Sequence, residues 1–298
     1  SPTLLVSGSN GFNFNGEVRM LTTGSSSAYN LAQYFALTTA GLYAWGTQGR
    51  VVATSVTSGT AMQPISLPPG IAPAQVKMID AGSSYTTTGA AGSYSSHNGS
   101  LALLTTSGQV WIRSSVNSAN TTDAFNAVQG DGNLLPDNSS TGWHLVQTSA
   151  GVPLTGMLDV RTSGTVAMAT DGIKLYTWGR NMFTGDGTAA TTLHYATEMT
   201  SPAGLSTPIK QIDIGYGNNI AASYFVLDQA GVVHVLGNNN AGQLGIGNTV
   251  TQLSWNKIAQ KNEEPEIAGN QADVTTPIGV VTKISTNNHG AFHGRLML

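Results

Sequence analysis

A short pattern of alternating apolar residues that ends in glycine recurs along the chain, and it constrains the fold more than any other feature. The pattern is clearest in GVVHVLGNNNAGQLG at residues 231–245. Related segments begin at Thr3 (TLLVSGSNG), Gly41 (GLYAWGTQG), Gly108 (GQVWIRSS) and Ile173 (IKLYTWGRN). Alternation followed by glycine predicts a β-strand that runs into a tight turn. Its recurrence predicts a fold built from similar units.

Two further apolar segments precede this motif strand in each unit. The first has the form of VKMIDAG at 76–82, and the second, SLALLTTSG at 100–108, leads through a turn to the motif strand. Two apolar strands joined by a turn with glycine predict a β-hairpin. Each unit is therefore expected to be a small antiparallel sheet of three strands. The first segment recurs at 18–24, 157–164, 209–215 and 281–287.

The spacing of the motif glycines indicates how the units are arranged. Gly8, Gly46, Gly179 and Gly237 mark four units, and Arg113 takes the glycine's place in another. The chain begins in the second half of a unit and ends in the first half of one, so its two ends together make one unit. Sheets placed radially about an axis close through such a shared sheet, whereas an open solenoid needs capping repeats.

We therefore predict an all-β fold, with residues 1–298 forming a single β-propeller domain of five antiparallel blades. The N- and C-terminal strands are expected to pair in one blade and close the ring. Six blades follow if the segment 114–156 contains a further unit.

Residues 209–247 resemble the repeat of the regulator of chromosome condensation family. The resemblance rests on Ile212, Gly215, Gly231, Val233, Gly237, Asn238, Gly242, Gln243, Leu244 and Gly245, and a tryptophan-glycine pair is kept at Trp45-Gly46 and Trp178-Gly179. Residues 283–293 are similar to the first half of the repeat and place His289 where the family has a structural histidine. The resemblance implies a β-propeller, of seven blades in the usual member. It also implies, as an alternative function, nucleotide exchange on a small GTPase.

The motif residues are interpreted as structural. Their glycines are expected to allow positive φ and close approach of strands. Trp45 and Trp178 are expected to fill the space between neighbouring blades, since large aromatic side chains dominate buried area. Asn238 and Gln243 are expected to bond backbone groups in turns.

Composition excludes several classes of function. Only 9% of residues are charged, and the 12 basic and 15 acidic residues are scattered singly. Without a basic stripe we expect no nucleic-acid partner. No apolar run reaches the length of a membrane span, and the first residues lack the basic and apolar regions of a secretory signal. The absence of cysteine excludes disulfides and thiolate metal sites.

No arrangement of residues predicts catalysis, a cofactor or a metal. The six histidines (His97, His144, His194, His234, His289 and His293) form no zinc motif, and Gly-Asp-Gly at 130–132 and 185–187 is typical of turns. Asp80, Asp159 and Asp213 recur at similar strand positions. Their recurrence favours a structural ring; if they converged on a central channel with raised pKa values, they would instead favour a carbohydrate-active site.

Two loops are the candidates for partner contacts. Residues 114–143 form the longest irregular stretch, and its apolar residues Phe125, Leu134, Leu135 and Trp143 are better buried against the body or a partner than in water. Residues 259–277 form an acidic loop, interpreted as solvated or as a charge patch for a partner.

The abundance of glycine, hydroxyl and amide residues, together with low charge, favours a non-enzymatic structural or interaction module. We expect a virion protein (a phage tail, collar or head-decoration protein) or a cell-surface protein, located on the virion or the extracellular surface. Its partners would be other proteins of a larger assembly, or a receptor. The alternative is a propeller that binds or acts on carbohydrate, with surface glycan as its partner.

Overall fold

The computed structural model is all-β, and two short 3-10 turns are its only helical elements among the described residues. These turns are η1 (Pro73–Gln75) and η2 (Ala127–Gln129). The structure describes residues 14–26, 31–46, 59–87, 94–115, 127–133, 142–215, 222–260, 273–277, 280–286 and 295–297. No helix in these ranges is long and apolar enough to span a membrane.

Four four-stranded antiparallel sheets follow one another along the chain. Sheet 1 contains β1 (Val18–Ser26), β2 (Leu31–Thr38), β3 (Leu42–Gly46) and β4 (Gly59–Ile65). Sheet 2 contains β5 (Val76–Thr87), β6 (Tyr94–Thr105), β7 (Val110–Ser115) and β8 (His144–Leu145). Sheet 3 contains β11 (Asp159–Thr162), β12 (Val166–Thr170), β13 (Leu175–Met182) and β14 (Thr191–Glu198). Sheet 4 contains β15 (Gln211–Gly215), β16 (Ser223–Leu227), β17 (Val233–Gly237) and β18 (Gln252–Lys257).

Three two-stranded sheets complete the described structure. Sheet 5, at the C-terminal end, pairs β21 (Ile284–Thr286) with β22 (Arg295–Met297). The others pair β9 (Gln147–Ser149) with β10 (Val152–Pro153), and β19 (Ala259–Gln260) with β20 (Asp273–Pro277).

The units have one strand more than the sequence predicts. Three strands were expected in each, but β4, β8, β14 and β18 add a fourth to each complete sheet. These outer strands lie at the edge of their sheets, where neither face is fully covered. Their side chains therefore need no regular apolar alternation. The strand β18 (QLSWNK), for example, has no fully buried residue.

The sequence also places the motif glycine of sheet 2 one residue too early. Gly237 pairs with Ser223 in sheet 4, and the matching pair in sheet 2 is Ser114 with Ser100. Ser100 and Ser223 each pair in turn with the glycine in the first strand of their own sheet. Ser114, and not Arg113, therefore holds the glycine position, and Arg113 holds the tryptophan position before it.

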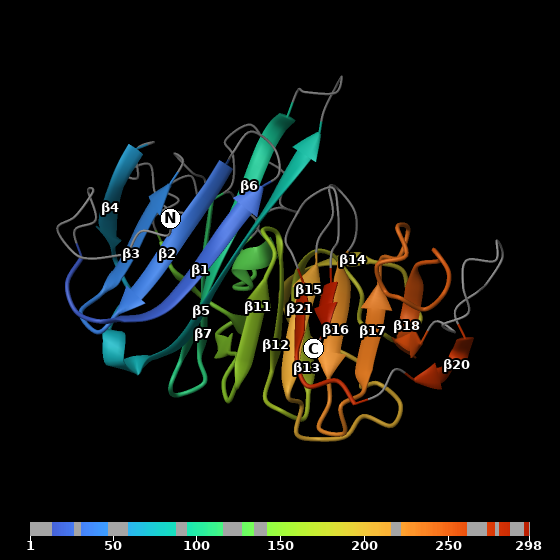
Figure 1. Cartoon of the computed structure of the whole chain (residues 1–298). Helices are drawn as coiled ribbons and strands as arrows, with labels where there is room; N and C mark the ends of the chain where they lie inside the picture. The colour runs from blue at the N-terminus through green and yellow to red at the C-terminus, as the bar shows by residue number, and fades with distance from the viewer. Residues whose placement is uncertain are drawn as a thin grey trace.

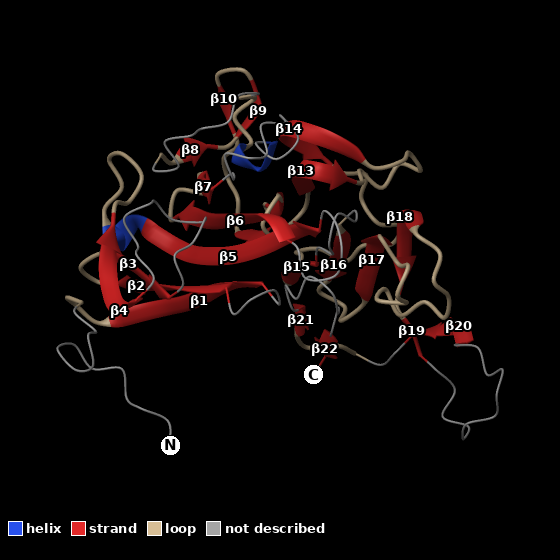
Figure 2. Cartoon of the chain, turned by 90° about the horizontal axis from the view of Figure 1, so that it is seen from above, coloured by secondary structure: helices blue, strands red, loops and turns tan. Residues whose placement is uncertain are grey.

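The sheets stack on one another through their faces. We call the face of each sheet that is turned toward the preceding sheet its front face, and the opposite one its back face. The first strands β1, β5, β11, β15 and β21 contact one another in chain order. In Figure 2, β5 to β8 and β15 to β18 run outward from the same central region in different directions, and Figure 1 shows the sheets side by side from the blue end of the chain to the red end.

One rule describes all four junctions: an apolar back face packs against the next front face. Phe35 and Leu37 of sheet 1 pack with Leu101 and Leu103 of sheet 2 in one core cluster. The later junctions have equivalent clusters, in which Ala102 packs with Val160 and Trp178, Met168 packs with Ile212 and Tyr224, and Phe225 packs with Ile284.

A backbone hydrogen bond repeats at one end of the sheets. The turn between the second and third strands offers a glycine carbonyl, and the residue leading into the next sheet donates its N–H. The pairs are Met157 to Gly108, Ile209 to Gly172 and Val281 to Gly231, at 3.0, 2.7 and 2.9 Å. The repetition at successive junctions shows that the units share one geometry.

No closed ring is seen in the part of the chain that the structure describes. The front face of sheet 1 is partly exposed: Leu21 is 61% exposed and Tyr34 is 41% exposed, while Tyr43 and Met62 on the same face are buried. The N-terminal half of the predicted closing pair lies in residues 1–13, outside the described ranges. The described part of 114–156 contributes β8, η2 and the β9–β10 hairpin and no further four-stranded sheet.

Candidate functional site at the centre of the sheets

Three carboxylates and one guanidinium gather where the first strands meet. Asp80 lies on β5, Asp159 and Arg161 lie on β11, and Asp213 lies on β15. Side chains alternate between the two faces of each strand, so Val160 and Ile212 point into the core. The neighbouring residues Asp159, Arg161 and Asp213 lie on the opposite face and are half-buried. The Asp80, Asp159 and Arg161 side chains are 19%, 17% and 28% exposed.

Each carboxylate accepts a backbone hydrogen bond from the next sheet. The Thr162 N–H donates to Asp80 Oδ2 at 2.8 Å, and the Thr286 N–H donates to Asp213 Oδ2 at 2.7 Å. Asp159 accepts from the backbone of Ile212 in the same way. These bonds satisfy N–H groups on strands that pair with no neighbour on that side.

Uncharged side chains accept backbone N–H groups in the same way between sheets 1 and 2 and, beside Asp213, between sheets 4 and 5. In sheet 1 the Thr22 hydroxyl accepts the N–H of Ala81 at 3.1 Å. In sheet 4 the Gln211 amide accepts the Ile284 N–H at 3.1 Å and donates to the Ile284 carbonyl at 2.5 Å. By register Thr22 holds the position of Asp80, and Gln211 holds the position of Asp159. A carboxylate is therefore one of several acceptors that these two positions take.

The central charge is unbalanced, since one cation faces three carboxylates. Arg161 lies 3.3 Å from Asp159 (Nε to Oδ1) and 3.6 Å from Asp80 (Nη1 to Oδ1). Burial disfavours its charged form, but Asp159 and Asp80 outweigh this and raise the pKa of Arg161. Arg161 thus remains a cation and partly neutralises the cluster.

Burial dominates the carboxylates. It raises the pKa of Asp80 to about 7, and the attraction of Arg161 and the Thr162 N–H offset only part of the rise. Burial also raises the pKa values of Asp159 and Asp213, against the same attraction from Arg161. Convergence and raised pKa values are two of the three features named above for a carbohydrate-active site, and the described residues do not show the third, a central channel. The backbone bonds give the carboxylates a structural role between neighbouring sheets.

The described residues contain no group of three histidine, aspartate or glutamate side chains arranged to hold a metal ion. Gly-Asp-Gly at 130–132 and 185–187 forms turns, in which Asp131 accepts the Asn133 N–H at 3.0 Å and Asp186 accepts the Thr188 N–H at 3.0 Å. Asp131 also bonds His144 Nδ1 at 2.7 Å, and the buried His234 bonds Asp228 at 3.1 Å.

The two motif tryptophans lie in different surroundings. Trp178 is fully buried between sheets 2 and 3, and its indole N–H donates to the Val128 carbonyl at 2.9 Å. Trp45 is half-buried on the open front face of sheet 1, where it stacks on Tyr34 with ring centroids 5.5 Å apart. Gly46 and Gly179, which follow them, both have positive φ.

The asparagine-rich corner after β17 is a buried turn network. The side chain of Asn238 accepts the Asn240 N–H at 3.3 Å, and Gln243 accepts the Ala241 N–H at 2.9 Å. Gly242 has φ 71° and donates its N–H to the Asn239 carbonyl at 2.9 Å. Gly237 has φ 101° and lies against the backbone of Ala222.

The candidate loops are only partly described. Trp143 donates its indole N–H to the Ser66 carbonyl at 2.8 Å and packs against the core between sheets 1 and 2. The acidic loop is described at its ends, where β19 pairs with β20. Gly8, Phe125, Leu134, Leu135 and His289 lie outside the described residues.

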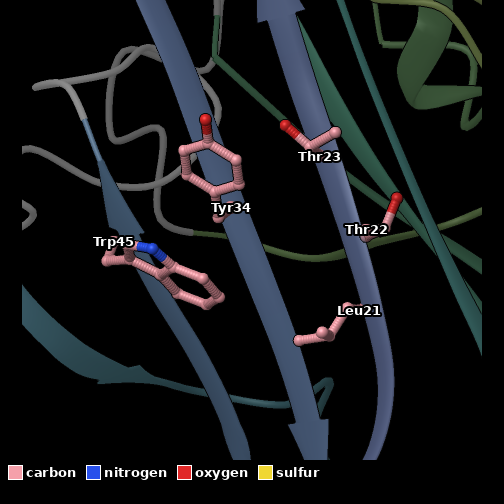
Figure 3. Close-up of a pocket in the computed structure, with 5 residues that line it drawn as sticks. All are labelled: Leu21, Thr22, Thr23, Tyr34 and Trp45. Carbon is pink, nitrogen blue, oxygen red and sulfur yellow. The ribbon is translucent and has the colours of Figure 1, made fainter. Parts of the chain in front are cut away.

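Sequence reasoning missed two features of the site. Arg161 was not singled out, although it stands two residues after Asp159 and so shares its strand face. The pocket between Leu21, Tyr34 and Trp45 in Figure 3 was also missed. No local pattern marks it, because the same positions are core in the other sheets.

Comparison with known proteins shows a likeness of fold alone. No protein-family model matches the chain, and no curated protein matches it. The crystal structure of human WBSCR16 aligns with 96% of this chain at a TM-score of 0.61 and 15% sequence identity. The chain spans 58% of the length of that structure's chain. This chain is therefore similar in fold to a longer protein at low sequence identity.

Proposed function

We propose that the protein is a non-enzymatic interaction module: a rigid stack of β-sheets that docks other proteins in a larger assembly. A virion protein (phage tail, collar or head-decoration) or a cell-surface protein fits this role. We also propose that the sheets are blades of a five-bladed β-propeller, which the terminal strands close. The repeated inter-sheet bonds and the stacking rule support this architecture.

The observation that carries the docking role is an apolar rim at one end of the sheets. The rim consists of Leu158, Ile173 and Val280, which are 52%, 63% and 76% exposed. Leu158 and Ile173 lie by the Gly172 turn of sheet 3, and Val280 lies by the Gly231 turn, which is the equivalent turn of sheet 4. Large apolar side chains gathered at one end of a fold are typical of a protein contact surface.

The central carboxylates support a scaffold role over a catalytic one. Asp80, Asp159 and Asp213 each accept a hydrogen bond from a backbone N–H of the next sheet with one carboxylate oxygen. A side chain that transfers a proton in a reaction must lie within hydrogen-bond distance of the substrate. The oxygens that accept the backbone N–H groups contact the protein instead.

Electron microscopy of the native assembly tests the docking role. We expect the chain in a repeated position, with the rim buried in an interface above about 1,000 Å². The variant Leu158→Ser/Ile173→Ser/Val280→Ser should leave the chain folded and prevent its incorporation. Val250→Ser is the matched control, since Val250 is 64% exposed at the opposite end of sheet 4. A rim that faces solvent in the assembly would contradict the proposal.

The convergent carboxylates favour one second candidate, a carbohydrate-active or carbohydrate-binding propeller. A glycan array and an assay for release of reducing sugar test it directly. Under this alternative, Asp159→Asn and Asp213→Asn abolish the activity while Glu17→Gln, at an exposed carboxylate, leaves it unchanged. If the wild-type chain neither binds nor cleaves a broad glycan panel, the scaffold role stands.

A further inference from the structure

The lysines are scattered singly along the sequence, but the fold gathers them at one end. This rim end is the end of the sheets that carries the apolar rim, where the first strands begin and the turns between the second and third strands lie. Every lysine in the described part of the chain lies there, and each is exposed. They are Lys77 at the start of β5, Lys174 in the turn before β13, Lys210 directly before β15, Lys257 at the end of β18 and Lys283 directly before β21.

One position on the first strands joins the basic and the apolar residues into one surface. It lies two residues before the residue that points into the core, such as Ile79 in sheet 2. Arg19, Lys77, Leu158 and Lys210 hold this position in sheets 1 to 4, and all four are exposed. Leu158 belongs to the rim, so a cationic side chain stands at the equivalent place in each of the other three sheets. Because the first strands contact one another in chain order, these side chains lie on one continuous surface.

Most of these cations have no carboxylate partner within the described ranges. The Arg19 guanidinium donates to the Pro73 carbonyl at 2.8 Å, and Lys77 Nζ donates to the Leu158 carbonyl at 2.9 Å. A carbonyl group carries no net charge, so both side chains keep their full positive charge at the surface. The lysines that have no side-chain hydrogen bond or ion pair in these ranges are Lys210, Lys257 and Lys283.

The carboxylates at the rim end offset only part of this charge. Lys174 forms an ion pair with Glu198 at 2.9 Å. Asp171 accepts two backbone N–H groups of its own turn, at 2.8 and 2.6 Å. Glu17 is exposed and pairs with none of the cations in the described ranges. The central carboxylates lie further along the first strands, where they face Arg161. The rim end therefore keeps an excess of positive charge around its apolar side chains.

We propose that the partner that docks on the rim is a protein with an acidic surface, whose carboxylates face the lysines while its apolar side chains cover Leu158, Ile173 and Val280. The inference rests on the proposed docking role and names the chemistry of the partner. Complementary charge steers such a partner and fixes its register, and the apolar centre excludes water. The rim has aliphatic side chains only, whereas contacts with nucleic-acid bases and with the lipid interface favour aromatic ones.

A labelled peptide of five Glu-Glu-Leu repeats tests this surface by fluorescence anisotropy. The chain has a net charge of −3, so an acidic peptide is repelled by the molecule as a whole and binds only through a local excess of positive charge. We expect the peptide to bind at low salt, and its affinity to fall about tenfold or more between about 50 and 300 mM salt. A peptide of Lys-Lys-Leu repeats should not bind.

A charge variant locates the contact. Lys210→Gln/Lys257→Gln/Lys283→Gln removes three cations that hold no bond in the fold, and we expect it to weaken peptide binding about tenfold or more. The matched control Ala189→Glu/Thr249→Glu/Val250→Glu changes the net charge by the same amount at exposed positions of the opposite end, and it should bind within about twofold of the original chain. Urea unfolding of both variants checks that the fold is kept.

Three outcomes would overturn the acidic partner. The first is that the original chain does not bind the Glu-Glu-Leu peptide, and the second is that both variants lose binding equally, which would assign the effect to net charge. The third is tighter binding of phosphatidylserine vesicles or of a DNA duplex than of the peptide, which would assign the surface to a membrane or a nucleic acid. A rim that is buried in the native assembly against a face without carboxylates would also reject the inference, and docking by the rim would then stand without it.

Discussion

Trp45 and Trp178 occupy the same place in two sheets, and only one of them is buried. Each stands on the third strand of its sheet, directly before a glycine with positive φ, and each lies on the front face of that sheet. Trp178 is fully buried against sheet 2, whereas Trp45 is half-buried on the front face of sheet 1, where it stacks on Tyr34. The repeat motif thus sets the backbone position of a residue, and the neighbouring sheet sets how much that residue stabilises the fold.

Replacing the two tryptophans gives the largest expected difference. Trp178→Ala should lower the free energy of unfolding by about 4 kcal/mol, because it leaves a cavity between two complete sheets and removes the bond to Val128. Trp45→Ala should cost about 2 kcal/mol, since Trp45 is only half-buried and stacks on the exposed Tyr34. Urea unfolding measures both values. Equal costs would show that the face of sheet 1 is as well covered as the others.

A glycine at a covered junction provides the next test. A Cβ on Gly82 would lie 2.5 Å from the Cα of Ser163 on the next sheet, where only backbone could move. Gly82→Ala should therefore cost about 3 kcal/mol. Gly41→Ala is the control, because its Cβ would lie 3.6 Å from the Tyr43 ring in ordinary contact, and we expect a change below about 0.5 kcal/mol. A mild effect at Gly82 would mean that sheets 2 and 3 separate easily.

How much of this could be predicted from the sequence differs from one element to the next. The strand LYTWG and its relatives were predictable, because alternation and a terminal glycine are local signals. The all-β fold followed from them and is confirmed. The fourth strands were missed, since a half-exposed edge such as β18 needs no alternation. The shift from Arg113 to Ser114 was missed because pairing with Ser100 fixes the register, and VWIRSS contains no glycine to mark it.

The central cluster was visible in the sequence only as a recurrence. Asp80 and Asp213 stand at matching strand positions, and that spacing was read correctly from local pattern. Their hydrogen-bond donors, Thr162 and Thr286, lie 82 and 73 residues away along the chain. No spacing rule connects a carboxylate to a partner at that distance, so the bonds required the stacked sheets.

The junction between sheets 2 and 3 should respond to pH through Asp80. Its folded-state pKa of about 7 lies above the ordinary value, so the folded chain binds this proton more tightly than the unfolded chain. The stability from this group is therefore complete below the unfolded-state pKa and is lost as the pH rises through about 7. We expect the free energy of unfolding to rise by about 1–2 kcal/mol from pH 8 to pH 5.

The variant Asp80→Asn isolates this contribution. An amide oxygen can still accept the Thr162 N–H, so the junction persists while its titration disappears. Most of the difference between pH 8 and pH 5 should vanish in urea unfolding. Glu17→Gln, at an exposed position, should keep the wild-type dependence. An unchanged dependence in Asp80→Asn would assign the effect to Asp159 and Asp213, whose pKa values burial also raises.

The smallest expected effect lies on the open face itself. Leu21→Ser should cost about 1 kcal/mol, because Leu21 is 61% exposed, whereas Ile79 at the equivalent position of sheet 2 is 6% exposed. Ile79→Ser, at the equivalent covered position, should cost about 3 kcal/mol. If Leu21→Ser costs as much as Ile79→Ser, Leu21 is covered in the folded protein as fully as the core residue at the equivalent position, and the contrast between Trp45 and Trp178 is not one of burial.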